Sequence, residues 1–122
     1  MYERLNRSTE NALAYRITTK LSTSEARQLT DELEGAISTA GKIRILIDLQ
    51  AFPYGEMGAL WEDLKFEFKY RKQIERLALA GGEEVRKWSS RIFVKLAGVK
   101  TGFFGPDQID EAWQWLIEEN SK

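Results

Sequence analysis

Residues 99–116 read VKTGFFGPDQIDEAWQWL, and this stretch decides the fold. Residues 99–103 are predicted to form a short strand. Gly105-Pro106 then starts a last helix over residues 106–119, because proline suits the first turn of a helix. The side chains expected to face the core recur at helical spacing, with Trp115 projecting to the side: Ile109, Ala112, Trp113 and Leu116. The stretch therefore predicts a strand followed by an amphipathic helix.

The chain before this stretch alternates between strands and helices. Strands are predicted over residues 1–5, 12–19, 43–49 and 74–80, and helices over 22–39, 56–72 and 83–97. The segment 43–49, IRILIDL, is almost entirely apolar, which is typical of a central parallel strand covered on both faces. The order β-β-α-β-α-β-α-β-α predicts a single α/β domain over residues 1–122, with a mostly parallel sheet of four to five strands and about four helices.

Local signals support the boundaries of the helix over residues 22–39. Ser22 followed by Glu25 fits a capping box at its start, and Gly41 is placed to end it. On the preceding strand, Leu13, Tyr15 and Ile17 are expected to share one face. These features predict that the helix packs on the sheet through one apolar side.

Composition removes several classes of function. The chain has 18 basic and 19 acidic residues and a net charge of −1, which gives no basic surface for nucleic acid. It contains no histidine and no cysteine, so a histidine-based catalytic triad, a thiol nucleophile and a zinc site built on these ligands are impossible. We therefore expect no enzyme activity, no metal and no cofactor. Without an apolar leader or membrane-spanning stretch, a cytoplasmic protein is expected.

Aromatic residues give the strongest suggestion of a ligand site. Phe52 and Tyr54 lie in the loop after the central strand, at the sheet edge where open α/β proteins usually bind ligands. In the helix over 56–72, Phe66 and Tyr70 fall opposite the core stripe that contains Trp61. These side chains could line an apolar pocket. Alternatively, Phe52 and Tyr54 could cap the core, and Phe66 and Tyr70 could be single exposed apolar residues on the surface. Both readings remain open from the sequence.

Two acidic residues and a glycine pair have simpler explanations. Asp48 and Glu56 lie near the same sheet edge and could do acid–base chemistry, but a capping or loop hydrogen-bond role is favoured for Asp48. Gly81-Gly82 stands between a strand and a helix, yet it lacks the spacing of a phosphate-binding loop and is followed by two glutamates. A phosphate site is not expected there.

Residues 74–88, IERLALAGGEEVRKW, together with Phe103-Phe104 and the segment from Ala112 to Leu116, resemble the SpoIIAA-like family, a branch of the STAS domains. The resemblance implies a small, mostly parallel sheet with helices against it. It also implies similarity to the lipid-binding CRAL-TRIO domains, with apolar ligands or membranes engaged by moving helices. STAS antagonists of anti-sigma factors carry a phosphorylated serine after the central strand. This sequence has no serine or threonine between Gln50 and Gln73, so that switch is not expected.

Two hypotheses of function follow. The first is a non-enzymatic domain that binds an apolar small molecule or lipid, with peripheral association to a membrane surface as a further expectation. Its lining would be formed by five aromatic residues, with Gly55 and Gly58 as hinges: Phe52, Tyr54, Trp61, Phe66 and Tyr70. The second is a protein-interaction module that self-associates, as a homodimer, through the same aromatic residues.

Overall fold

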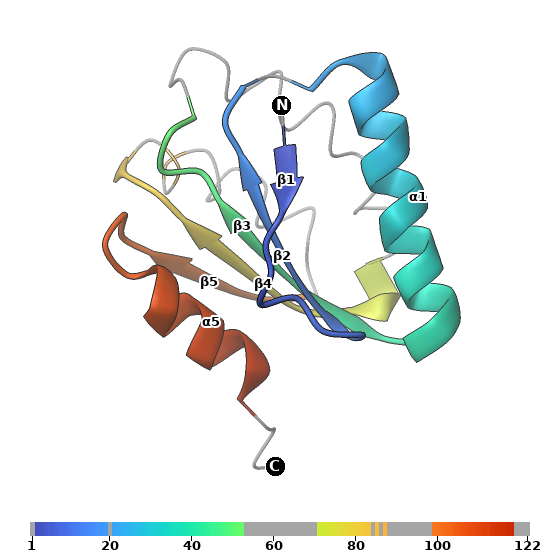
Figure 1. The fold of residues 1–122 in the computed structure, drawn as a ribbon. Helices are drawn as coiled ribbons and strands as arrows, with labels where there is room; N and C mark the ends of the chain where they lie inside the picture. Colours follow the sequence, from blue (N-terminus) through green and yellow to red (C-terminus); the bar gives the residue numbers. More distant parts are fainter. Residues whose placement is uncertain are drawn as a thin grey trace.

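The computed structural model describes residues 2–19, 21–52, 71–83, 85, 87 and 99–118. Within these residues the chain forms a five-stranded sheet in the order β1-β2-β3-β4-β5, so neighbouring strands follow one another along the chain (Figure 1). The elements, in chain order, are β1 (Tyr2–Arg4), β2 (Ala12–Ile17), α1 (Thr23–Ala40), β3 (Ile43–Asp48), the 3₁₀ turn η2 (Arg71–Gln73), β4 (Ile74–Ala80), β5 (Lys100–Phe104) and α5 (Ile109–Ile117).

The sheet is mixed, which corrects the prediction of a mostly parallel sheet. β2, β3, β4 and β5 run parallel to one another, whereas β1 pairs antiparallel with β2. A short loop joins β1 to β2, and such a connection can link only antiparallel neighbours. All five strand positions were predicted, and β4 has the bounds expected.

The described part of the chain contains two α-helices where the sequence predicted about four helices in all. The helix predicted over residues 56–72 lies outside the described residues except for its last two positions, which belong to η2. Of the helix predicted over 83–97, residues 83, 85 and 87 are described and are helical.

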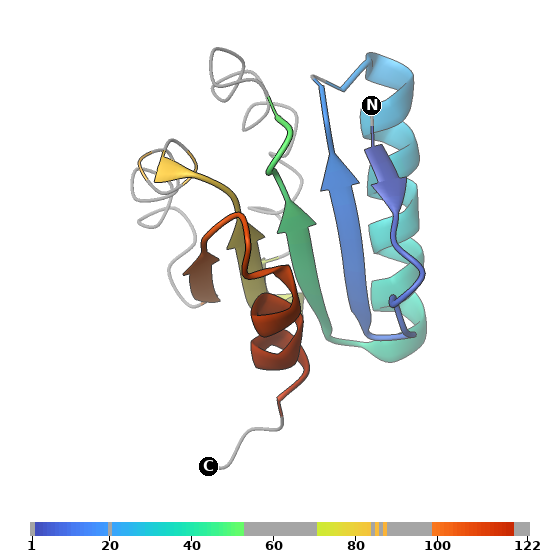
Figure 2. The ribbon, with the colours of Figure 1, turned by 60° about the vertical axis from the view of Figure 1, so that its left-hand side comes forward.

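Opposite faces of the sheet carry two different cores, because successive side chains of a strand point to opposite sides. α1 covers one face and α5 covers the other (Figure 2). The α1 face is built from large side chains, including Leu13, Tyr15 and Ile17 as predicted. On the α5 face the buried sheet residues are mostly small, and α5 contributes the larger side chains of Trp113 and Leu116. The buried members of this face are Ala12, Ala14, Leu46 and Ala78 from the sheet, and Ala112, Trp113 and Leu116 from α5.

Both boundaries of α1 confirm the sequence signals. The Ser22 hydroxyl accepts a hydrogen bond of 3.1 Å from the Glu25 backbone N–H, and the Glu25 carboxylate accepts one of 3.0 Å from the Ser22 N–H. This reciprocal pair is a capping box. At the other end Gly41 adopts φ +84°, and its N–H donates to the Ile37 carbonyl over 2.7 Å. Glycine is favoured there because it adopts a positive φ without a steric penalty.

α5 begins later than predicted, at Ile109 and not at Pro106. Residues 105–108 form a turn closed at both ends, in which the Gln108 N–H donates to the Gly105 carbonyl at 3.0 Å and the Gly105 N–H donates to Gln108 Oε1 at 2.7 Å. Pro106 therefore sits in this turn. The predicted inward face of α5 is confirmed, because Ala112, Trp113 and Leu116 are buried.

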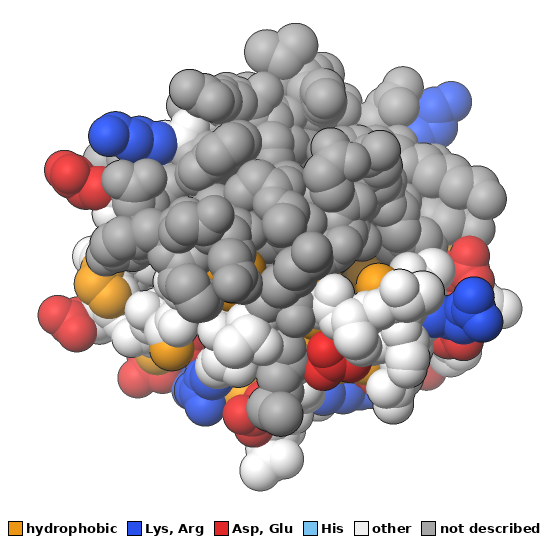
Figure 3. All heavy atoms as spheres, turned by 90° about the horizontal axis from the view of Figure 1, so that it is seen from above, with side chains coloured by type: hydrophobic (Ala, Val, Ile, Leu, Met, Phe, Trp, Pro, Cys, Tyr) orange, Lys and Arg blue, Asp and Glu red, His pale blue; other side chains and the backbone are white. Residues whose placement is uncertain are grey.

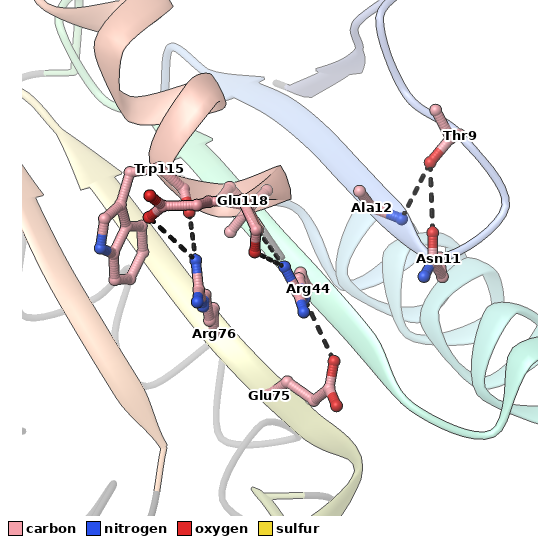
Figure 4. Close-up of polar contacts among 9 residues, drawn as sticks. Thr9, Asn11, Ala12, Arg44, Glu75, Arg76, Trp115 and Glu118 are labelled. Atoms are coloured by element: carbon pink, nitrogen blue, oxygen red, sulfur yellow. Dashed lines mark hydrogen bonds and ion pairs between the residues drawn. The ribbon is translucent and has the colours of Figure 1, made fainter. Parts of the chain in front are cut away.

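The C-terminal end of α5 is held by two arginines from the sheet (Figure 4). Arg44 of β3 donates from Nη1 to the carbonyls of Leu116 at 2.8 Å and Glu118 at 2.7 Å. Arg76 of β4 donates to the Trp115 carbonyl, and its guanidinium lies 5.2 Å from the centre of the Trp115 ring. These cations complement the negative end of the helix dipole and bond carbonyls that have no partner within the helix.

Candidate functional site

A pocket of about 260 Å³ lies at the carboxyl ends of β4 and β5, the edge at which open α/β sheets usually bind ligands. Two strand ends and the turns that follow them form its walls. The described lining residues are Leu79, Gly81, Gly82, Glu83, Val85, Phe103, Phe104, Gly105, Pro106 and Gln108. Leu79 and Val85 are buried in the apolar core on the α1 face and Phe103 is partly buried against it, so the floor of the pocket lies against one end of that core.

The glycine after β4 sets the shape of one wall. A Cβ atom built on Gly81 would lie 2.5 Å from Val85 Cγ2 and 3.2 Å from Val85 Cβ, which is too close for any larger residue. The Gly81 N–H donates to the Phe104 carbonyl at 3.0 Å, so it also ties the end of β4 to the end of β5. Gly81 therefore lets the helical turn at Val85 close tightly over the strand ends.

The turn at residues 105–108 forms the other wall. Its two internal hydrogen bonds fix Gly105 and Gln108 beside each other, and Phe104 enters the turn from β5. Phe104 is itself anchored on the opposite face, where its ring centre lies 5.7 Å from that of Trp115. The contact between Phe104 and Trp115 thus supports this wall from α5, although α5 itself does not line the pocket.

Charge around this edge is mixed. In the view of Figure 3, both acidic and basic side chains lie around the rim of the described surface. Among the described lining residues, Glu83 carries a formal charge and is exposed, whereas the remaining ones are apolar, glycine or amide residues. The site is a mainly apolar hollow with an acidic group at its mouth.

The sequence placed the candidate site one strand away from this pocket. Phe52, the predicted lining residue that the structure describes, is 3% exposed and packs in the core on the α1 face, with its N–H donating to the Leu49 carbonyl at 3.1 Å. It is not among the residues around the pocket. Four other predicted lining residues lie outside the described residues: Tyr54, Trp61, Phe66 and Tyr70.

Asp48 has the loop role that the sequence favoured. Its side chain is buried at the end of β3, where Oδ1 accepts a hydrogen bond of 3.0 Å from the Gln50 N–H. Oδ2 lies 3.2 Å from Nε of Arg16, so both carboxylate oxygens are engaged. Glu56, the other acidic candidate, lies outside the described residues together with the predicted hinges Gly55 and Gly58.

The part of the chain that the structure describes has neither a metal cluster nor a membrane-spanning helix. No group of three or more acidic, histidine or cysteine side chains is arranged there to hold a metal ion. No helix in those same ranges is long and apolar enough to cross a membrane.

The sequence did not predict this pocket, because the candidate site was chosen by its content of aromatic residues. The loop after β3 carries two aromatic residues, whereas the turns after β4 and β5 carry glycines and a proline. The same rule about carboxyl ends of strands applies to all parallel strands of a sheet. A glycine directly after each of two neighbouring strands, at Gly81 and Gly105, was the signal that could have located the pocket.

Known proteins resemble this chain in sequence and in fold. A family model described as SpoIIAA-like matches residues 12–117. A crystal structure of an uncharacterised DUF3478-family protein from Shewanella loihica PV-4, described as having a SpoIIAA-like fold, is similar with a TM-score of 0.68 and 27% sequence identity, over 95% of this chain and 94% of that one. Among curated proteins none matches this chain.

Proposed function

This chain belongs to the SpoIIAA-like family, and we propose that it is a non-enzymatic STAS-type module that binds a small apolar molecule in the pocket at the carboxyl ends of β4 and β5. The observation that carries the proposal is the pocket itself, which lies between two glycine turns and is lined by the partly exposed rings of Phe103 and Phe104. When an apolar ligand covers a partly exposed aromatic side chain, the removal of that apolar surface from water favours binding.

Pocket size sets the scale of the ligand. Small-molecule pockets usually span about 300–1,000 Å³, so a volume of about 260 Å³ lies just below that range. At roughly 30 Å³ per water-sized group, the pocket accommodates about nine non-hydrogen atoms. This size supports a compact molecule or the end of one acyl chain, and a membrane lipid would enter by a single chain end.

The role is proposed to be binding because the chemistry around the pocket is limited. Histidine and cysteine do not occur in the sequence, and the buried carboxylate nearest the sheet edge, Asp48, is engaged by Arg16 and Gln50. Regulation through the serine of other STAS domains is also not proposed, since the matching segment has no hydroxyl residue. Ligand occupancy would instead be the signal that the module transmits.

The first test is native mass spectrometry of freshly purified protein, with an organic extract analysed beside it. A co-purifying apolar molecule of small mass is the expected result. A dimer peak without any bound molecule would favour the alternative, a self-associating interaction module.

Titration with 1-octanol locates the site. The backbone amide NMR signals of Gly81, Gly82 and Gly105 are expected to shift together, because these glycines line the pocket. Phe103→Ser should weaken octanol binding by roughly threefold, since the ligand removes from water only the part of this half-buried ring that faces the pocket. Ile117→Ser is the control, because Ile117 lies on α5, is 39% exposed and is not among the lining residues. A folded Phe103→Ser protein that binds octanol as tightly as the wild type would contradict the proposal.

A further inference from the structure

We infer that the pocket selects its ligand by charge and takes an apolar molecule that carries a positively charged group, such as a primary amine, in preference to one that ends in a carboxylate. This inference rests on the proposed function, because it concerns the same pocket. It adds a property that an apolar cavity alone would not have.

Glu83 is the first observation. Among the lining residues that the structure describes, it is the one with a formal charge, and it belongs to the helical turn that closes the pocket over β4. Its negative charge at the mouth of the pocket attracts a cationic group and repels an anionic one.

The backbone donors around the pocket are the second observation. An anion needs N–H groups that point at it, and several of the lining amides are already engaged within the protein. The N–H of Gly81 donates to Phe104 at 3.0 Å, that of Val85 to Gly82 at 3.1 Å, that of Gly105 to Gln108 Oε1 at 2.7 Å, and that of Gln108 to Gly105 at 3.0 Å. These four N–H groups are therefore not available to bind a carboxylate or a phosphate.

The start of a helix usually favours anions because its first N–H groups have no partner within the helix, and Glu83 lies in such a turn. Here the Val85 N–H, which belongs to that first turn, is satisfied by the Gly82 carbonyl. A glutamate in a first turn places negative charge at the positive end of the helix dipole and offsets it. Glu83 therefore adds negative charge at the mouth of the pocket.

The remaining lining determines the rest of the ligand. Leu79, Val85 and Phe103 supply an apolar floor, so the body of the ligand is a hydrocarbon or aromatic group. The two features together describe a small amphiphilic cation, with its apolar part on the floor and its charge beside Glu83.

Three probes of equal chain length test this inference: octylamine, 1-octanol and octanoate, each titrated at neutral pH and low salt and followed by the amide signals of Gly81, Gly82 and Gly105. We expect octylamine to bind roughly two- to fivefold more tightly than octanoate, as an exposed charge pair allows. The difference should shrink in high salt, because salt screens exposed charges. Glu83→Gln should remove most of the difference between octylamine and octanoate.

The matched control is Glu10→Gln, which makes the same change of charge at an exposed position in the loop before β2, at the opposite end of the sheet. It should leave the preference for octylamine intact. Octanoate binding as tightly as octylamine, or an equal loss of preference in both variants, would overturn the inference while octanol binding still supported the proposed function. If none of the three probes shifts the glycine signals, the proposed function fails and the inference falls with it.

Discussion

Gly102 of β5 is the residue against which the indole of Trp115 lies. A Cβ atom at this position would come 2.9 Å from Phe104 Cε1 and 3.2 Å from two atoms of the Trp115 ring. Trp115, which projects sideways from α5 as the sequence predicted, thus packs where Gly102 of the edge strand has no side chain. Glycine is required here for space, and its freedom of backbone conformation plays no part.

Gly102→Ala is therefore expected to destabilise the protein by about 1–3 kcal/mol, because the added methyl group overpacks two aromatic rings. Chemical denaturation followed by tryptophan fluorescence measures the change. Gly35→Ala is the control, since nothing lies within 4 Å of a Cβ atom there and Gly35 is inside α1. That change should stabilise by about 0.5–1 kcal/mol. Equal effects of the two substitutions would contradict this account of Gly102.

Tyr2 and Tyr15 share the carboxylate of Glu32. The Tyr2 hydroxyl donates to Oε2 at 2.8 Å and the Tyr15 hydroxyl donates to Oε1 at 3.1 Å. Burial raises the pKa of both tyrosines, and the hydrogen bond and negative charge of Glu32 raise it further. Each tyrosine therefore keeps its proton in the folded protein at a pH where the unfolded chain, with a pKa of about 10, has lost it.

The stability from this cluster is fully present below about pH 10 and is lost as pH rises above that value, because the unfolded state then binds fewer protons than the folded state. We expect the denaturation midpoint to fall steeply above about pH 10. Tyr15→Phe should lower stability at neutral pH by about 1 kcal/mol, through the lost hydrogen bond, and should also flatten the alkaline fall. An unchanged alkaline slope in the variant would show that other groups cause it.

At the scale of elements, α5 depends on its neighbours. It has nine residues, and Gln108 at its N-cap makes no side-chain capping bond. Helices this short are marginal alone. Its two ends are fastened by contacts from other elements: Arg7 pairs with Asp110 at 2.9 Å, and Arg44 bonds the carbonyls of Leu116 and Glu118.

Arg44→Met should therefore loosen the last turn of α5 while leaving the sheet folded. Amide hydrogen exchange in α5 is expected to rise by roughly tenfold, the change that follows from losing about 1.4 kcal/mol of local stability. Exchange in α1 should stay as it is. Lys42→Met is the control, because it removes one exposed cation from the turn before β3. If exchange in α5 is the same in both variants, the arginine does not hold the helix.

Element boundaries show what sequence patterns can and cannot predict. The capping box at Ser22, the glycine stop at Gly41 and the bounds of β4 were predictable because each signal is local. The start of α5 was not, since it depends on the side chain of Gln108 folding back to the Gly105 N–H. The pocket was missed for a related reason: it needs two strand ends distant in sequence, and aromatic content alone cannot tell the buried Phe52 from a lining residue.

At the scale of the whole molecule, the two faces of the sheet differ in the size of their side chains. The α1 face carries bulky residues such as Ile45, whereas α5 sits on alanines such as Ala78. Both of these residues are fully buried. α5 can therefore approach the sheet closely, and it has little space for a larger side chain beneath it.

Ala78→Leu is expected to displace α5 and to cost about 1–3 kcal/mol or more through overpacking. Ile45→Val, on the other face, should cost about 0.5–1.5 kcal/mol through a small cavity. Denaturation gives both values, and near-ultraviolet circular dichroism reports the surroundings of Trp113 and Trp115. A smaller cost for Ala78→Leu than for Ile45→Val would mean that α5 is not closely packed.

Because the spatial order of the five strands is also their order along the chain, assembly can proceed by adding each new strand to the one just made. α5 follows all five strands along the chain, so the side of the sheet that it covers has no cover until the ribosome has made this helix. Three of the four sheet residues buried on that side are alanines. Because alanine side chains carry little apolar surface, we expect chaperones and other unfolded chains to bind this side of the sheet only weakly before α5 is made.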